Sequence, residues 1–238
     1  MQKNKHMPKD KKPGDASQGG MRQIHTKVKM ARGRKRSSTK WLQRQLNDPY
    51  VQMAQRDGYR SRAAYKIIEI DDKFNIFKPG KSVVDLGAAP GGWTQVAVQR
   101  TKGAKVVGID LQEVEPIAGA SLIKYDFTED HALVLLEEEL QSKKVDVVLS
   151  DMAAPSCGHA QTDHIRIMAL CEMAFDFAKH NLNEDGAFAA KILQGGAEKE
   201  LLDDLKKHFK VVKHFKPNSS RKDSAEMYVV ATGFRISS

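Results

Sequence analysis

Four polar residues stand where the surrounding pattern predicts partial burial: Lys66, Asp151, Lys191 and Glu226. Lys191 lies inside an otherwise apolar strand, where a charge costs free energy unless it is compensated or lost. Consider what these residues could do with a sulfonium methyl donor. Two lysines with two carboxylates could remove the proton of a weakly acidic sugar hydroxyl while its oxygen attacks the methyl group in an in-line displacement. One lysine would stay charged and orient the hydroxyl, while the other, whose ammonium form is disfavoured by its surroundings, would act as the base.

The same four residues also have a purely structural interpretation, as two buried salt bridges that tie a helix to neighbouring strands. The spacing alone supports the two interpretations about equally, and it does not rank Lys191 above Lys66 as the base. Methyl transfer to a carbon or nitrogen of a nucleobase generally uses other residues, such as a cysteine nucleophile. A sugar oxygen is therefore the favoured acceptor.

A glycine-rich turn follows the first predicted strand, in the stretch SVVDLGAAPGGW at 82–93. Its spacing, Gly87-x-x-x-Gly91-Gly92, matches neither a dinucleotide fingerprint nor a phosphate loop, and Pro90 removes an N–H that a phosphate cradle would use. Glycine allows a sharp turn and a close approach of ligand to backbone. A nucleoside ligand without phosphates therefore fits better, and S-adenosylmethionine is the common one. An ordinary tight strand-to-helix turn is the alternative.

An aspartate lies at the carboxyl end of each of the first four predicted strands: Asp85, Asp110, Asp126 and Asp151. In an open α/β sheet these ends meet at one edge, where ligands bind. Asp110 stands 25 residues after Asp85, about where a dinucleotide fold places its ribose-binding acid. Four acids in register are hard to explain as strand endings alone, and they indicate a ligand site.

The elements that must position these residues alternate between strand and helix, which is typical of an α/β, Rossmann-like sheet. Ser61 is expected to cap the first helix of the body, and 183–186 is expected to be a turn before the fifth strand. Hydrophobic periodicity predicts helices at 61–74, 94–101, 133–140, 163–181 and 197–209, and strands at 83–85, 105–110, 121–125, 145–150, 187–193, 211–215 and 227–232.

The positive charge of the 238-residue chain is concentrated at its amino terminus. The formal net charge is +9, but residues 1–45 carry 14 Lys and Arg against 2 acidic residues, so the remainder is slightly acidic. Residues 1–38 have few large apolar side chains and are expected to form a disordered basic arm before a single domain at 39–238. Such an arm gains affinity for a polyanion through counterion release. A solvated tail that only aids solubility is the alternative.

The remaining composition excludes several classes of protein. Cys157 and Cys171 imply neither a disulfide framework nor a zinc site, so no metal is expected. No apolar run approaches the length of a membrane span and no secretory signal is seen, so the expected location is the cytoplasm. Aromatic residues between Lys40 and Tyr59 either stack on exposed bases or tie the arm to the body.

Five motifs, in order, resemble the FtsJ-like ribosomal RNA large-subunit methyltransferase E family. They are YRSRAAYK at 59–66, DLGAAPGGW at 85–93, SDMA at 150–153, AKILQG at 190–195 and SRKDSAEMYVVATG at 220–233. The resemblance covers roughly residues 41–234. It implies a class I S-adenosylmethionine-dependent methyltransferase fold, with a seven-stranded, mostly parallel sheet whose last strand is antiparallel. It also implies 2'-O-methylation of a uridine ribose in 23S ribosomal RNA, within the 50S subunit. The enzyme is expected to be a monomer.

Carried over residue by residue, the family's catalytic Lys-Asp-Lys-Glu set falls on Lys66, Asp151, Lys191 and Glu226, and the resemblance makes Lys191 the proton acceptor. The cofactor contacts that it implies fall on Gly91, Trp93, Asp110, Asp126 and Asp151. The strand end and glycine turn add Asp85 and Gly87 as candidate cofactor-binding residues.

Two departures from the family pattern stand out. Many family members have proline directly after the first alanine that follows the catalytic aspartate, whereas this chain has Ala154 before Pro155. The arm before Trp41 is also longer than in compact members. Two other functions stay open: the same reaction on transfer RNA or another RNA, such as a messenger cap, and a noncatalytic RNA-binding or ribosome-assembly factor. A dehydrogenase is disfavoured by the glycine spacing.

Overall fold

The computed structural model describes residues 36–141, 143–194 and 199–236, and the chain divides into two compact units, Met1–Asn47 and Asp48–Ser238. The described part of the first unit is helix α1 (Arg36–Leu46) and Asn47. The predicted disordered arm at 1–38 lies almost wholly outside the described residues. Helix α1 begins at Arg36, before the predicted boundary at residue 38.

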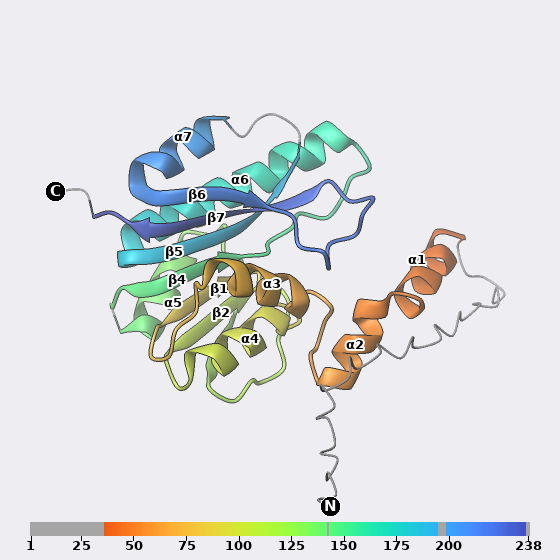
Figure 1. Ribbon diagram of the computed structural model, residues 1–238, viewed down its shortest axis with the longest axis horizontal. Coiled ribbons are helices and arrows are strands. Elements are labelled where there is room, and N and C mark those ends of the chain that lie inside the picture. Colours follow the sequence, from red (N-terminus) through yellow and green to blue (C-terminus); the bar gives the residue numbers. More distant parts are fainter. Residues whose placement is uncertain (1–35, 142, 195–198, 237–238) are drawn as a thin grey trace, which may run out of the picture. The chain divides into compact units, whose positions relative to one another are not determined.

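The second unit is built on a seven-stranded sheet with strand order β3-β2-β1-β4-β5-β7-β6 (Figure 1). The neighbouring pairs among the first five strands are parallel, whereas β7 is antiparallel to both β5 and β6. The predicted fold class is therefore confirmed. The strands are β1 (Val83–Leu86), β2 (Val106–Asp110), β3 (Ala120–Lys124), β4 (Val145–Ser150), β5 (Leu182–Leu193), β6 (Phe209–Phe215) and β7 (Glu226–Phe234).

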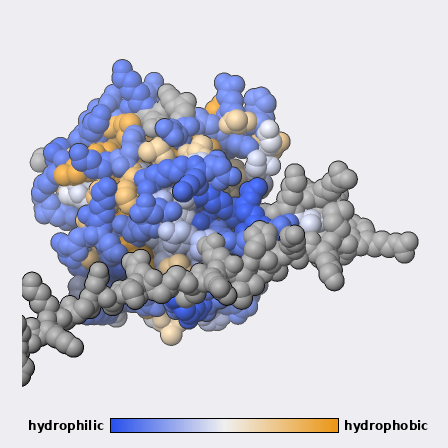
Figure 2. All heavy atoms as spheres, turned by 45° about the vertical axis from the view of Figure 1, so that its right-hand side comes forward, coloured by the Kyte–Doolittle hydropathy of each residue, from blue (hydrophilic) through white to orange (hydrophobic). Residues whose placement is uncertain are grey.

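Helices cover both faces of this sheet and bury two apolar cores. α3 and α4 pack on one face, where Ile67, Trp93 and Tyr228 are buried together, and α5, α6 and α7 pack on the other. The helices of this unit are α2 (Pro49–Asp57), α3 (Ala64–Phe74), α4 (Gly92–Thr101), α5 (His131–Leu140), α6 (Ala160–Asn181) and α7 (Lys199–His208). Hydrophilic residues cover much of the coloured surface in Figure 2. No helix in the described ranges is long and apolar enough to cross a membrane.

The prediction that Ser61 caps the first helix of the body is wrong. α3 begins at Ala64, and no side chain caps it. The chain instead enters the helix through a tighter turn, in which the amide of Ala64 donates to the carbonyl of Ser61 and that of Tyr65 to the carbonyl of Arg62, both at 3.2 Å. These i to i+3 bonds satisfy amides that a capping side chain would otherwise serve.

The predicted turn at 183–186 lies within β5 and not before it. Leu182 pairs with Val145 and Ala187 pairs with Val147, so residues 183–186 face the single residue Asp146 of β4. The extra residues form an irregular bulge, in which Asp185 has a φ of 60°. Turn-forming residues therefore interrupt the ladder locally, and strand pairing resumes after them.

Candidate active site

The aspartates predicted to share one sheet edge do so. Asp85 is the residue before the last of β1, Asp110 ends β2, and Asp151 directly follows β4. These three strands are parallel neighbours, so their carboxyl ends lie side by side. Asp126 follows β3, the next strand along the same sheet. The edge therefore carries a row of carboxylates from four separate stretches of the chain.

The two remaining candidate catalytic residues of the sheet reach the same edge because β7 runs antiparallel. Lys191 lies near the end of β5 and pairs across the ladder with Tyr228. Glu226 is the first residue of β7 and pairs with Leu193, the last residue of β5. Residues two apart on a strand face the same side of a sheet, so Glu226 and Tyr228 share a face. α3, which carries Lys66, packs on that face.

The four candidate catalytic residues form two ion pairs. The Lys191 Nζ lies 2.7 Å from Oδ1 of Asp151, and it also donates to the main-chain carbonyl of Asp151 at 2.8 Å. The Lys66 Nζ lies 2.7 Å from Oε1 of Glu226 and 2.8 Å from its Oε2. Each lysine side chain is only 10% exposed, so both amines are nearly removed from bulk water. The structure thus brings together all four residues that the sequence singled out.

Tyr228 joins the two ion pairs, and the sequence did not single it out. Its hydroxyl donates to Oδ1 of Asp151 at 2.9 Å, and the Lys66 Nζ lies 5.7 Å from the centre of its ring. Burial, together with the charges of Asp151 and Glu226, raises the pKa of Tyr228 well above its ordinary value. Its place two residues after Glu226 on one strand was the available signal.

Asp151 is ionised despite its position in the protein. Burial opposes its charge, but the ammonium groups of Lys191 and Lys66, with hydrogen bonds from Lys191 and Tyr228, outweigh that effect and lower the pKa of Asp151. A carboxylate that is charged over the whole neutral range holds the Lys191 amine at a fixed place on the sheet edge.

The glycine turn is shaped by close contacts that only glycine permits. Gly87 has a φ of 81°, and a Cβ there would lie 2.9 Å from both the backbone nitrogen and the Cα of Met152. Gly91 has a φ of 111°, and a Cβ there would lie 2.8 Å from Cδ1 of Ile117 and 3.1 Å from Cδ of Arg60. At both positions the backbone has a positive φ and neighbouring atoms occupy the place of a Cβ, so glycine is required.

Asp110 and Arg60 fix the backbone on the other side of this turn. Asp110 accepts hydrogen bonds from the amides of Ala89 and Gln112, at 2.9 and 2.8 Å. The Arg60 guanidinium donates to the carbonyls of Glu115 and Pro116, at 2.5 and 2.7 Å. The loop after β2 is thus tied both to the glycine turn and to the segment that precedes α3.

Asp85 is completely buried beneath the turn and is only half satisfied. Its Oδ2 accepts from the hydroxyl of Thr94 at 2.6 Å, whereas its Oδ1 has no hydrogen-bond partner among the described residues. Burial, with the nearby charges of Asp151 and Asp110, raises the pKa of Asp85 to about 7, although the hydrogen bond from Thr94 acts the other way. A free carboxylate oxygen at this position fits a ligand that brings an amino group or hydroxyl.

The raised pKa of Asp85 predicts a pH dependence of stability. The folded carboxyl keeps its proton up to about pH 7, whereas the unfolded one loses it near 3.8. The free energy of unfolding should therefore fall as the pH rises between these values, by up to about 4 kcal/mol from this group, and no further above them.

Asp85→Asn should remove that fall, and chemical denaturation of the cofactor-free protein at pH 5 and pH 8 measures it. The exposed Asp223→Asn is the control and should keep the wild-type difference between the two pH values. An Asp85→Asn protein that loses as much stability as wild type between pH 5 and pH 8 would contradict the interpretation.

Asp126 and Trp93 use their polar groups within the protein. Oδ1 of Asp126 accepts from the amide and the hydroxyl of Thr128, at 2.8 and 2.7 Å. The indole N–H of Trp93 donates to the carbonyl of Ala63 at 2.8 Å, and its ring lies 5.5 Å from that of Tyr228. Both residues support the sheet edge, and their contact with a cofactor stays a prediction.

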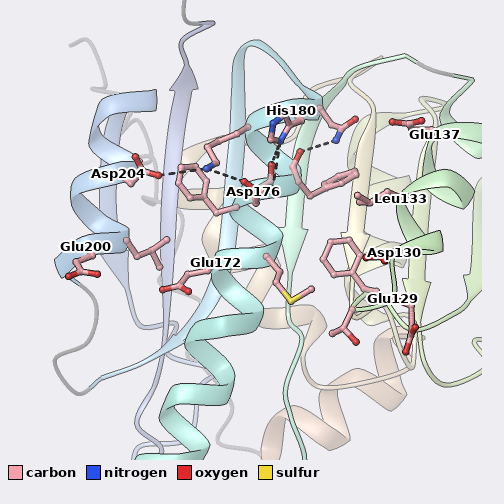
Figure 3. Close-up of a pocket in the computed structure, with 17 residues that line it drawn as sticks. Glu129, Asp130, Leu133, Glu137, Glu172, Asp176, His180, Glu200 and Asp204 are labelled. Carbon is pink, nitrogen blue, oxygen red and sulfur yellow. Dashed lines mark hydrogen bonds and ion pairs between the residues drawn. The ribbon is translucent and has the colours of Figure 1, made fainter.

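A separate groove of about 930 Å³ lies along α5, α6 and α7, on the opposite face of the sheet from α3 (Figure 3). None of the candidate catalytic residues lines it. Its carboxylates come from Glu129, Asp130, Glu137, Glu172, Asp176, Glu200 and Asp204. So many negative charges repel a polyanion, which makes the groove unsuitable for nucleic acid and leaves the sheet edge as the candidate site.

A comparison with protein families agrees with this architecture. The profile of a family described as FtsJ-like methyltransferase matches residues 59–234. A crystal structure from Plasmodium falciparum, assigned as a ribosomal RNA methyltransferase, is similar to this chain with a TM-score of 0.67 and 35% sequence identity. The similarity covers 74% of this chain and 98% of that one.

Bacterial proteins named ribosomal RNA large subunit methyltransferase E are similar over almost the whole chain. The protein of Parvibaculum lavamentivorans is 54% identical, over 94% of this chain and 92% of its own length. That of Paramagnetospirillum magneticum is 57% identical, over 94% of both chains. That of Roseobacter denitrificans is 56% identical, over 94% of this chain and 98% of its own.

Proposed function

The chain belongs to the FtsJ-like methyltransferase family, and from that premise we propose that it methylates a ribose 2'-hydroxyl of a uridine in 23S ribosomal RNA. The methyl donor is S-adenosylmethionine and the substrate is the RNA of the large, 50S subunit. The enzyme acts as a monomer in the cytoplasm. The names of the similar proteins support ribosomal RNA of the large subunit as the substrate.

The observation that carries the proposal is the environment of the Lys191 amine. The Lys191 ammonium, which is paired with Asp151 at rest, must first give one proton to solvent to act as a base, and the neutral amine then has two N–H donors and one lone pair. Two acceptors, both from Asp151, lie within 2.8 Å of the Lys191 Nζ and match the two donors. The lone pair then remains to take the proton of a hydroxyl that attacks the methyl group. This arrangement supports Lys191 as the general base.

Lys66 is suited to the complementary role. Both carboxylate oxygens of Glu226 lie within 2.8 Å of its Nζ, so the pair is a close ion pair that keeps an ammonium on the sheet edge. An ammonium with a free N–H can donate to the hydroxyl oxygen and stabilise the charge that develops there as the proton leaves. The two lysines thus divide orientation and proton removal between them.

The residues around the glycine turn fit S-adenosylmethionine, which supplies an electrophilic methyl group when bound. The backbone at Gly87 packs against Met152, beside Asp151, and so fixes the turn at the sheet edge, and the unpartnered Oδ1 of Asp85, once ionised, can accept from the amino group of the donor. Asp110 stands at the end of β2, where a fold of this type holds a ribose, and Asp126 follows β3 on the same sheet edge.

Methylation mapping tests the proposed substrate. Purified 50S particles and total RNA from a strain that lacks the gene are incubated with the enzyme and radiolabelled S-adenosylmethionine, and 2'-O-methylated positions are read by their resistance to alkaline hydrolysis. One labelled uridine in 23S RNA is the expected result. Label in transfer RNA alone would assign the enzyme a different substrate, and no label in any RNA would favour a noncatalytic role.

The basic amino terminus is proposed to contact the RNA backbone. Removing residues 1–35, which leaves α1 intact, should weaken RNA binding and flatten its dependence on salt. Each phosphate contact that is lost should reduce the slope of log K against log salt by about 0.7 on single-stranded RNA. Filter binding at several salt concentrations measures this slope. An unchanged slope would show that the arm makes no phosphate contacts.

A further inference from the structure

The loop that leads into β7 is fastened to α3 and to the turn before it. Glu69, on α3, accepts from the amides of Asn218 and Ser219, at 2.5 and 2.9 Å. The Arg62 guanidinium donates to the carbonyl of Ser219 at 2.5 Å. Three main-chain groups of two neighbouring loop residues are therefore held by side chains from a segment about 150 positions earlier in the chain.

Arg62 is itself held in place by an ion pair with Asp48. Its Nε lies 3.0 Å from Oδ2 of Asp48, and the same oxygen lies 3.8 Å from Nε of Arg221 in the loop. Asp48 is buried, and its other oxygen accepts from the amide of Tyr50 at the start of α2. The loop is thus held on both sides of Ser220, by hydrogen bonds at Ser219 and by the ion pair of Arg221 with Asp48.

Ser220 links this fastened loop to the candidate active site. Its hydroxyl donates to Oε1 of Glu226 at 2.9 Å, and that oxygen also lies 2.7 Å from the Lys66 Nζ. Ser220 is 5% exposed, so water cannot readily replace its hydroxyl. A glutamate side chain has three rotatable bonds, and its ion pair with Lys66, through both oxygens, still leaves the two flexible side chains free to move together. A second bond from a rigid loop removes that freedom.

We propose that Ser220 is a positioning residue, which aligns Glu226 so that Lys66 points its remaining N–H at the substrate hydroxyl. The inference rests on the proposed function, because it assigns Ser220 a role in that same reaction. Ser220 acts through Glu226 and touches neither substrate nor methyl donor. Its loss should therefore slow the chemical step without weakening the binding of either.

The kinetic test compares Ser220→Ala with Ser219→Ala. Ser219 is the matched control, because its hydroxyl is buried but has no hydrogen-bond partner among the described residues. Ser220→Ala should lower kcat on 50S particles by about 10- to 100-fold, the range for a hydrogen bond to a charged group, with KM for RNA and for S-adenosylmethionine within about threefold. Ser219→Ala should keep kcat within about twofold of wild type, and Ser220→Thr, which retains a hydroxyl, should recover most of the loss.

A kcat for Ser220→Ala equal to that of Ser219→Ala overturns the assignment, as does a loss confined to KM. A second readout does not need activity. In a crystal structure of Ser220→Ala, Glu226 should leave its position on Lys66 or occupy more than one rotamer, while the loop backbone stays fixed. A Glu226 unchanged beside Lys66 would also overturn the inference. If wild type fails to methylate ribose, the proposed function falls, and the crystal structures still decide the role of Ser220.

Discussion

Lys191→Met is expected to lower kcat for methyl transfer by about 10²- to 10⁴-fold, the usual contribution of a general base. Methionine keeps much of the length and volume of the lysine stem but cannot accept a proton. The dissociation constant for S-adenosylmethionine should stay within about threefold of wild type, because the candidate cofactor contacts lie on other residues. Single-turnover kinetics on 50S particles and equilibrium binding of the methyl donor measure the two quantities separately.

The control for Lys191→Met is Lys213→Met. Lys213 also lies within a strand, β6, but its side chain is exposed. Its replacement should leave kcat within about twofold of wild type. Turnover by Lys191→Met at more than a tenth of the wild-type rate would rule out Lys191 as the base. A loss of donor affinity to match the loss of rate would instead assign it a binding role.

Gly87→Ala is expected to have the second largest effect, on both stability and donor binding. A residue other than glycine with a φ of 81° is strained by about 1–2 kcal/mol. The new Cβ would also lie 2.9 Å from backbone atoms of Met152, next to Asp151, and must displace that segment. Forcing a group into a packed site costs about 1–3 kcal/mol more, and affinity for S-adenosylmethionine should fall at least about tenfold.

Gly103→Ala separates the two causes. Gly103 has a φ of 87°, but nothing lies within 4 Å of the position of its Cβ. It should therefore show the backbone strain alone, with donor affinity unchanged. Thermal unfolding and isothermal titration of both variants test the difference. Equal losses of stability in the two variants, with equal donor affinity, would mean that the contact with Met152 does not shape the turn.

The sheet edge could be predicted from the sequence because its signals are local. An apolar stretch that ends in aspartate identifies a strand and its carboxyl end together, as for Val106 to Asp110. Parallel strands then bring such ends to one edge without further information. A lysine inside an apolar strand, as at Lys191, is equally visible, because burial of an amine needs a partner.

Two buried salt bridges could be suggested from the sequence, but which lysine pairs with which carboxylate could not, because it depends on contacts between distant parts of the chain. Lys66 meets Glu226 across 160 positions, and only the register of β5 against β7 sets Lys191 opposite Tyr228. The pattern around Tyr228 predicts only an ordinary aromatic residue in the core of a strand. Glu69 holds the loop through two backbone amides, and because almost every residue has such an amide, the sequence does not show which ones are bound.

The position of β7 along the chain has a consequence for biosynthesis. It follows every other strand in sequence, yet it inserts between β5 and β6, which are made before it. A ribosome releases the chain from its amino terminus, so a nascent protein presents Lys66 and Lys191 before Glu226 and Tyr228 exist. The pairing of β7 with β5 skips over α7 and β6, and such non-local pairing is slow to form. Catalytic competence therefore arises late, when the final strand docks into the gap left for it.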